Sequence, residues 1–182
     1  MQSIKMGSKE LRDYTPTPEE LAAVKHNPLY LVLDNVLDTY NIGSLFRLAD
    51  ALAVTKMYLC GDMQYPPSSR IHKAAVGTQM WVPWEKRDTT LEVIQELKEE
   101  GIHTIAVEQD PRSVTLKELS PSYPCAIVVG HETHGVSPDV LDAVDTIVEL
   151  PMYGVNKSFN VWGSAAVVAY TLVSGIRSNT GT

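Results

Sequence analysis

The chain has 182 residues, of which 44% are hydrophobic and 20% are charged, as in one folded globular domain and unlike a disordered chain. The net charge of -7 argues against a protein that coats nucleic acid with a large basic surface, but it leaves room for a small basic patch. Two cysteines, Cys60 and Cys125, are too few for a disulfide framework and favour a cytoplasmic protein. Neither an apolar signal segment nor a run long enough to span a membrane is found, so we expect no membrane partner.

Short apolar runs predict five buried strands, at residues 30–33, 57–60, 104–107, 126–129 and 146–150. Their apolar residues are continuous rather than alternating, which is typical of a parallel sheet covered on both faces. Helical patterns lie between most of them, at residues 18–25, 43–53, 90–100 and 161–176. We therefore predict an α/β domain with a mostly parallel sheet flanked by helices over residues 29–182, preceded by an N-terminal arm and helix over residues 1–28.

In such sheets, ligands bind outside the carboxyl ends of the strands, where loops lead into helices. Three loops meet this description, at residues 34–43, 130–138 and 151–160. We expect any functional site to be built from them.

The first loop leads to Asn41, Gly43 and Arg47. Arg47 lies off the apolar stripe of the following helix, about one turn past Gly43, so its guanidinium can reach back toward the strand end. A permanently charged fork of donors suits a phosphate or a developing oxyanion, and glycine permits close approach of the backbone to a ligand. Equally, Arg47 can pair with Asp50 on the surface of the helix. The residues alone leave both interpretations open.

The second loop follows an apolar strand and carries Glu132 between Gly130 and Gly135. Its backbone amides can face a ligand, and Ser137-Pro138 is typical of a helix start. His131 and His134 raise the possibility of a metal, but the helical zinc motif places its histidines four apart. We expect no metal site.

The third loop places a polar group before a very apolar helix, in the order Lys157, Ser158 and Asn160. Asn160 can cap that helix or form part of a pocket wall. Trp81, Trp84 and Trp162 can stack on bases, or they can pack in the core or at an interface, which we favour for Trp162. The phosphate-binding and serine-hydrolase motifs are absent from the sequence, which disfavours an ordinary nucleotide-binding enzyme.

Taken together and in order, the three loops resemble motifs of the SPOUT methyltransferases, specifically the SpoU (TrmH-like) family of RNA ribose 2'-O-methyltransferases. The first motif is matched by Asn41, Gly43 and Arg47, and the second by Gly130, Glu132 and Gly135. The third is matched by Leu150-Pro151-Met152 and Ser158-Phe159-Asn160-Val161. The likeness extends from about Leu29 to the C-terminus.

This resemblance implies a C-terminal trefoil knot, an exception to the rule that chains are unknotted. It implies S-adenosyl-L-methionine as cofactor, RNA (tRNA or rRNA) as substrate, and a homodimer packed through the first-motif helix and the C-terminal helix. By position, the cofactor-binding residues are Val107, Gly130, Leu150, Met152 and Ser158. The catalytic set is Arg47, Asn41, Glu132 and Asn160.

The implied reaction transfers a methyl group to a ribose 2'-hydroxyl. Arg47 would stabilise the oxyanion while a substrate phosphate takes the proton, and Asn41 would hold the ribose or its phosphate. The alternatives are methylation of a base and a non-catalytic protein that binds RNA or senses the cofactor.

The chain departs from the family in two respects. Trp162 stands where the family often has a second serine. The chain also lacks the separate RNA-binding domain of some relatives, so the dimer and the arm residues Lys5, Lys9 and Arg12 would supply the RNA contacts.

Overall fold

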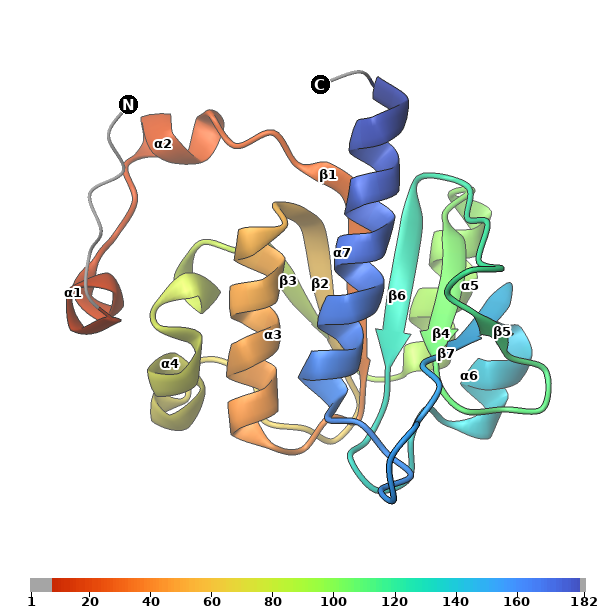
Figure 1. The fold of residues 1–182 in the computed structure, drawn as a ribbon. Helices are drawn as coiled ribbons and strands as arrows, with labels where there is room; N and C mark the ends of the chain where they lie inside the picture. The colour runs from red at the N-terminus through yellow and green to blue at the C-terminus, as the bar shows by residue number, and fades with distance from the viewer. Residues whose placement is uncertain (1–7, 181–182) are drawn as a thin grey trace.

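The computed structural model describes residues 8–180, and it describes side chains from residue 10 to residue 176 with the exception of residue 11. Lys5 lies outside the described residues, as does the side chain of Lys9, so the RNA contacts expected of them stay predictions. Figure 1 shows a central sheet with helices packed against it. The helical elements are α1 (Ser8–Asp13), α2 (Pro18–Ala22), α3 (Thr39–Ala51), α4 (Ser69–Ala75), the short 3-10 helix η1 (Thr78–Met80), α5 (Thr90–Glu99), α6 (Pro138–Ala143) and α7 (Val161–Thr180).

The sheet has seven strands in the order β3-β2-β1-β6-β4-β7-β5, and every neighbouring pair is parallel. The strands are β1 (Asn27–Asp34), β2 (Val54–Cys60), β3 (Trp84–Arg87), β4 (His103–Val107), β5 (Val114–Thr115), β6 (Cys125–Val129) and β7 (Thr146–Glu149). The predicted α/β class, the parallel sheet and the five predicted strands are confirmed. The two edge strands, β3 and β5, were not predicted, because neither is a continuous apolar run.

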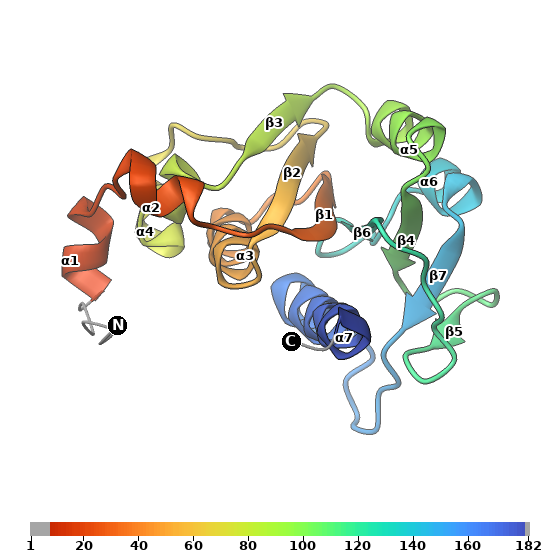
Figure 2. The same cartoon turned by 90° about the horizontal axis from the view of Figure 1, so that it is seen from above.

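Helices cover the sheet on both faces, as Figure 2 shows: α3, α4 and α7 lie on one face, and α5 and α6 on the other. Two buried clusters match these layers. Leu31 and Leu33 of β1 pack in the cluster that includes residues of α3 and α7, whereas Val32 between them packs with residues of α5 and α6. Successive strand residues point to opposite faces, so an uninterrupted apolar strand fills both clusters.

The helix α3 begins earlier than the sequence pattern predicted. Asp38 caps it by accepting a hydrogen bond from the amide of Tyr40 at 2.8 Å, so helix starts at Thr39 rather than at Gly43. Asn41 therefore lies in the first turn of α3 and not in the preceding loop. It is 2% exposed, so its side chain is buried.

Gly43 allows α3 and α4 to approach closely. A Cβ atom built on Gly43 would lie 2.5 Å from the Cβ of Ala74 and 2.7 Å from the backbone nitrogen of Ala75. Because no side chain fits there, the glycine serves helix packing, which differs from the ligand approach that we expected. The helix α4 itself was not predicted, because it is short and contains only two buried residues, Ile71 and Ala75.

Candidate active site

A cavity of about 350 Å³ opens where β4, β6 and β7 end. Val107 is the last residue of β4, Gly130 follows β6, and Leu150 follows β7. All five predicted cofactor-binding residues line this cavity, and so do Glu132 and Asn160 of the predicted catalytic set. The remaining lining residues are Glu108, Gln109, His131, Thr133, Gly135, Asn156, Phe159, Val161 and Ser164.

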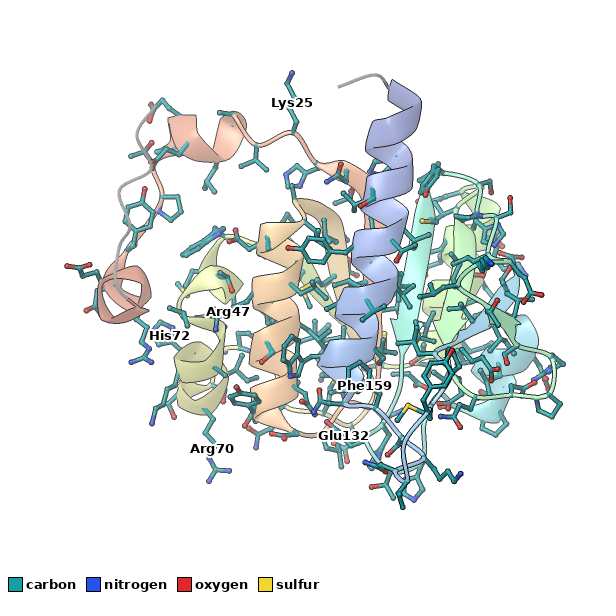
Figure 3. All side chains as sticks on the ribbon, viewed as in Figure 1. Lys25, Arg47, Arg70, His72, Glu132 and Phe159 are labelled. Carbon is teal, nitrogen blue, oxygen red and sulfur yellow. The ribbon has the colours of Figure 1, made fainter. Side chains whose placement is uncertain are left out.

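Glu132, Asn41 and Asn160 form one hydrogen-bonded chain that joins the first turn of α3 to the second and third loops. The Asn41 amide donates to Glu132 Oε1 at 2.9 Å, and the Asn160 amide donates to Asn41 Oδ1 at 3.1 Å. Asn160 Oδ1 also accepts from the amide of Trp162 at 3.0 Å, so it caps α7. The two interpretations left open for Asn160, a helix cap and a pocket wall, are therefore both correct. Figure 3 shows Glu132 and Phe159 at the end of the molecule where α3 and α7 begin.

Glu132 binds the start of α3 through its carboxylate. Besides the Asn41 amide, it accepts hydrogen bonds from the backbone amides of Leu37 at 3.1 Å and Asp38 at 3.0 Å. Partial burial opposes ionisation, but the hydrogen bonds from Asn41, Asp38 and Leu37 outweigh it and hold the pKa of Glu132 below its ordinary value. The carboxylate is therefore charged near neutral pH and committed to holding two loops together.

Gly130 and Gly135 close a tight loop on the cavity wall. His131 and Gly135 exchange backbone hydrogen bonds at 3.0 and 2.8 Å. A Cβ atom on Gly130 would overlap backbone atoms of Gly135 and Val136. Glu108 holds the far side of the loop, because its Oε2 accepts from the amide of Val136 at 3.0 Å. Gly130 is thus required by the close approach of two backbone segments.

Asp34, at the end of β1, holds the end of this loop through hydrogen bonds to Ser137. It is 1% exposed, and its carboxylate accepts hydrogen bonds from the Thr90 hydroxyl at 2.6 Å and from the amide and hydroxyl of Ser137 at 2.7 and 2.5 Å. The carboxyl end of β1 is in this way tied to the start of α5 and to the residue that precedes α6. Sequence reasoning used Asp34 only as a loop boundary, and the pattern gave no sign that this last residue of β1 is buried.

Arg47 lies apart from the cavity and is not among its lining residues. It follows Asn41 by six residues, which corresponds to about 9 Å along α3. Its side chain is exposed, and Figure 3 shows it between α3 and α4. The expected alternative, an ion pair with Asp50, is wrong: Asp50 accepts a hydrogen bond from the Trp81 indole at 2.6 Å. Arg47 forms no hydrogen bond or ion pair with any residue that the structure describes.

The side chains of His131, Cys60 and Cys125 have structural environments that do not indicate a catalytic role. Nδ1 of His131 accepts from the amide of Thr133 at 2.9 Å, and among the described residues no group of three or more potential ligands is placed to hold a metal ion. Burial raises the pKa values of Cys60 and Cys125 to about 12 each, so both free thiols stay protonated and unreactive.

Sequence reasoning missed several lining residues. Glu108 and Gln109 follow β4 directly, and the rule that ligands lie outside strand ends could have found them. Gln109 donates to the backbone carbonyl of Lys157 at 2.7 Å, which links this strand end to the third loop. Asn156 and Phe159 lie in irregular backbone, where no periodic pattern indicates which side chains face the cavity.

Fold and cavity together define a parallel α/β domain with a cavity for a small ligand at the carboxyl ends of its strands. Residues 28–170 match the model of the SpoU rRNA Methylase family. Because that match includes most of the chain, the protein belongs to this family.

Individual relatives agree with this membership. The chain is 29% identical over 152 residues to the tRNA (guanosine(18)-2'-O)-methyltransferase of Aquifex aeolicus, which covers 83% of this chain and 71% of that protein. It is 32% identical over 161 residues to the 23S rRNA (guanosine-2'-O-)-methyltransferase of Nitrosomonas europaea, covering 88% of this chain and 62% of that protein.

Solved structures show the same fold. The crystal structure of the A. aeolicus TrmH/SpoU tRNA modifying enzyme superimposes with a TM-score of 0.78 at 26% identity, over 96% of this chain and 84% of that chain. A rRNA methyltransferase from Sinorhizobium meliloti, solved with AdoMet bound, has a TM-score of 0.77 at 22% identity, over 91% of this chain and 60% of that chain.

Proposed function

We propose that this protein transfers the methyl group of S-adenosyl-L-methionine to a ribose 2'-hydroxyl of tRNA or rRNA. The observation that carries the proposal is the composition of the cavity. Two carboxylates, Glu108 and Glu132, line it, and neither lysine nor arginine is among its lining residues. Such a lining disfavours a phosphate-bearing nucleotide and suits a ligand that carries positive charge, as the sulfonium and ammonium groups of S-adenosyl-L-methionine do.

The remaining lining fits the rest of that cofactor. Val107, Leu150 and Met152 provide apolar surface for a purine ring, and Ser158 and Asn156 provide polar groups beside it. When bound, the cofactor supplies an electrophilic methyl group that needs no further activation. The protein must then hold the acceptor hydroxyl in line and stabilise the negative charge that develops on its oxygen.

We propose that Arg47 stabilises this negative charge in the cavity of a second protomer. Its side chain is exposed and unpaired within the described chain, yet it lies outside the cavity of its own protomer. The helices α3 and α7 pack side by side, and large apolar side chains are exposed on them and on the segment just before α7: Tyr40 62%, Phe159 53%, Trp162 38%, Val167 42% and Tyr170 53%. A two-fold dimer that covers this surface would bring an arginine of one protomer toward the cavity of the other.

The proposal also includes the trefoil knot, formed where the chain after β7 passes the loop after β6, and a cytoplasmic location. Support for the knot comes from the placement of these segments: both line the cavity, and Asn160, after β7, is linked through Asn41 of α3 to Glu132 in the loop after β6. Among the residues that the structure describes, no helix is long and apolar enough to cross a membrane. Base methylation and a non-catalytic role are less well supported, because the curated relatives described above are named as 2'-O-methyltransferases.

Calorimetry and a transfer assay test the proposal. The wild-type protein should bind S-adenosyl-L-methionine and move tritium from its methyl group into total tRNA or rRNA. Ser158→Trp, which fills the cavity from an exposed position, should abolish both without unfolding the protein. A wild-type protein that binds no cofactor contradicts the proposal.

A further inference from the structure

A second hollow lies at the opposite edge of the sheet, between the loop after β2, α4, η1 and β3. Its volume is about 550 Å³, and we call it the α4 groove. It is lined by Pro66, Pro67, Ser68, Ser69, His72, Gln79, Met80 and Trp84. The cavity described above lies at β6, β4 and β7, so the groove belongs to a different part of the molecule.

The walls of the α4 groove suit a flat ring. Trp84 packs edge-on against Phe46 with ring centroids 6.2 Å apart, which fixes the orientation of its indole. Pro66 and Pro67 add rigid apolar surface, and Met80 is 73% exposed at the rim. A purine or pyrimidine base buries apolar faces of this kind by stacking.

Gln79 offers a buried acceptor in the same groove. Its side chain is only 5% exposed, and its amide nitrogen lies 2.7 Å from Nδ1 of His72. Its carbonyl oxygen, Oε1, is buried and has no hydrogen-bond partner among the described residues. Buried acceptors are normally paired, so Oε1 would pair with an amino or ring N–H group of an occupant once the side chain turns toward the groove. Bases carry such groups on their edges.

The charges around the groove are arranged for an anion. Successive residues of β3 point to opposite faces of the sheet. On the α5 face, Glu85 and Arg87 are ion-paired, with Lys56 and Glu96 respectively. On the α4 face, Lys86 has no carboxylate partner among the described residues and interacts with Tyr65, through its hydroxyl at 3.3 Å and its ring.

The helix α4 adds two more cations to this face. Arg70 and Lys73 are exposed and three residues apart on α4, and neither has an ion-pair partner in the described part of the chain. Figure 3 shows Arg70 projecting from α4. Although the protein is acidic, the cations Arg70, Lys73 and Lys86 on the α4 face therefore have no carboxylate partner among the described residues.

We propose that the α4 groove binds a nucleotide of the RNA substrate at a distance from the methylated one. The base would lie between Trp84 and the two prolines with its edge on Gln79, and the phosphates would contact Arg70, Lys73 and Lys86. This inference rests on the proposed function for the identity of the RNA. It also answers the objection raised by the net charge of -7, because the basic surface needed is local.

A pair of matched charge reversals tests the phosphate contacts. Lys73→Glu reverses a charge on α4, the helix that contributes Ser69 and His72 to the groove. Lys117→Glu makes the same charge change just after β5, at the other edge of the sheet, at an exposed lysine that has no partner among the described residues. The probe is a fluorescein-labelled, unstructured 15-nucleotide RNA of mixed sequence, followed by anisotropy at several salt concentrations. Lys73→Glu should weaken binding about tenfold and reduce the salt slope by about one, and Lys117→Glu should change neither. Equal effects of the two variants, or no RNA binding by the wild type at low salt, would overturn the proposal.

Crosslinking tests the base contact. RNA that contains 4-thiouridine, irradiated on the wild-type protein and analysed by mass spectrometry, should crosslink to peptides that contain residues 65–72 or 79–84. Crosslinks found only elsewhere would overturn the base contact. It would also be overturned if RNA gave no crosslink in the groove and a protein partner displaced the RNA. The outcome is separable from the proposed function. If the protein transfers methyl groups but Lys73→Glu binds RNA as the wild type does, the groove proposal fails and the proposed function does not. If RNA binds in the groove but no methyl group is transferred, the proposed function fails and the groove proposal does not.

Discussion

The side-chain amide of Asn41 donates a hydrogen bond to the carboxylate of Glu132 at 2.9 Å, between residues 91 positions apart in the sequence. This contact joins the first turn of α3 to the loop that walls the cavity. Asn160 continues it to the start of α7. Three of the four residues that the resemblance predicts to be catalytic, Asn41, Glu132 and Asn160, are therefore joined to one another beside the cavity, and substitutions among them should alter stability as well as turnover.

Replacing Glu132 by glutamine should lower stability by about 1 kcal/mol. The glutamine keeps one acceptor oxygen, but its amide group faces the backbone donors of Leu37 or Asp38, so one hydrogen bond and the charge are lost. Because the Glu132 side chain is partly exposed, water can solvate the unpaired group, and the loss of unfolding free energy stays small. Urea unfolding at neutral pH measures it, and a variant as stable as the wild type would show that the carboxylate does not hold the loops.

The same pair of proteins should converge in stability at acid pH. The hydrogen bonds hold the pKa of Glu132 below its ordinary value, so its stabilising effect is complete above that value and is lost as the pH falls through the lowered pKa. Unfolding free energies measured from pH 7 downward should therefore show a difference that is constant at first and shrinks below about pH 4.5. A difference that grows on acidification would contradict the assigned direction.

Replacing Gly43 by alanine should destabilise the protein by about 1–3 kcal/mol, although alanine is the better helix former. The added methyl group would lie within 2.7 Å of the Ala75 backbone, so α3 and α4 must separate. Gly154→Ala is the matched control, because a Cβ atom there meets nothing within 4 Å. Thermal unfolding should separate the two variants clearly, and equal melting temperatures would show that the helices tolerate the shift.

Asp34→Asn should cost about 2–3 kcal/mol, because an amide group would face the donors Thr90 and Ser137 in a buried site. Thr90→Val, which removes one donor only, should cost about 1 kcal/mol. The first variant should also weaken cofactor binding, since Ser137 ends the loop that begins at Gly130. Calorimetry with S-adenosyl-L-methionine decides this last point, and unchanged affinity in Asp34→Asn would limit the aspartate to a role in stability.

Mixed dimers should reveal in which protomer Arg47 acts. Arg47→Ala and Ser158→Trp should each be inactive alone. A heterodimer of the two, isolated with two affinity tags, keeps one cavity that receives an arginine from the partner, so it should recover about half of the wild-type activity. If Arg47 serves its own cavity, the heterodimer should stay inactive.

Much of this arrangement could be predicted from the sequence, because it depends on local patterns. The apolar runs identify the central strands, and the strand-end rule locates the cavity at Gly130 and Leu150. The edge strands could not be predicted, since Trp84–Arg87 is charged in its interior and pairs on one side only. The predicted start of α3 was four residues late, because Asp38 and Gly43 can both mark a helix start and the prediction followed the glycine.

The position of Arg47 relative to the cavity was beyond sequence reasoning for a different reason. Helical spacing predicts on which side of α3 the Arg47 side chain lies, but it does not predict which other elements pack next to that side. Pairing with Asp50 was a sound local expectation, and the more distant Trp81 took that acceptor instead. Contacts between residues far apart in the chain, such as those of Asp34 and Glu108, were missed for the same reason.

The most direct test of the central claim is the identity of the modified nucleoside. RNA incubated with the wild-type protein and S-adenosyl-L-methionine is digested to nucleosides and analysed by mass spectrometry, with Arg47→Ala as the paired sample. We predict a nucleoside whose added methyl group is on the ribose, present with the wild type and absent with the variant, while the variant still binds the cofactor. A methyl group on a base, or equal ribose methylation by both proteins, would contradict the account.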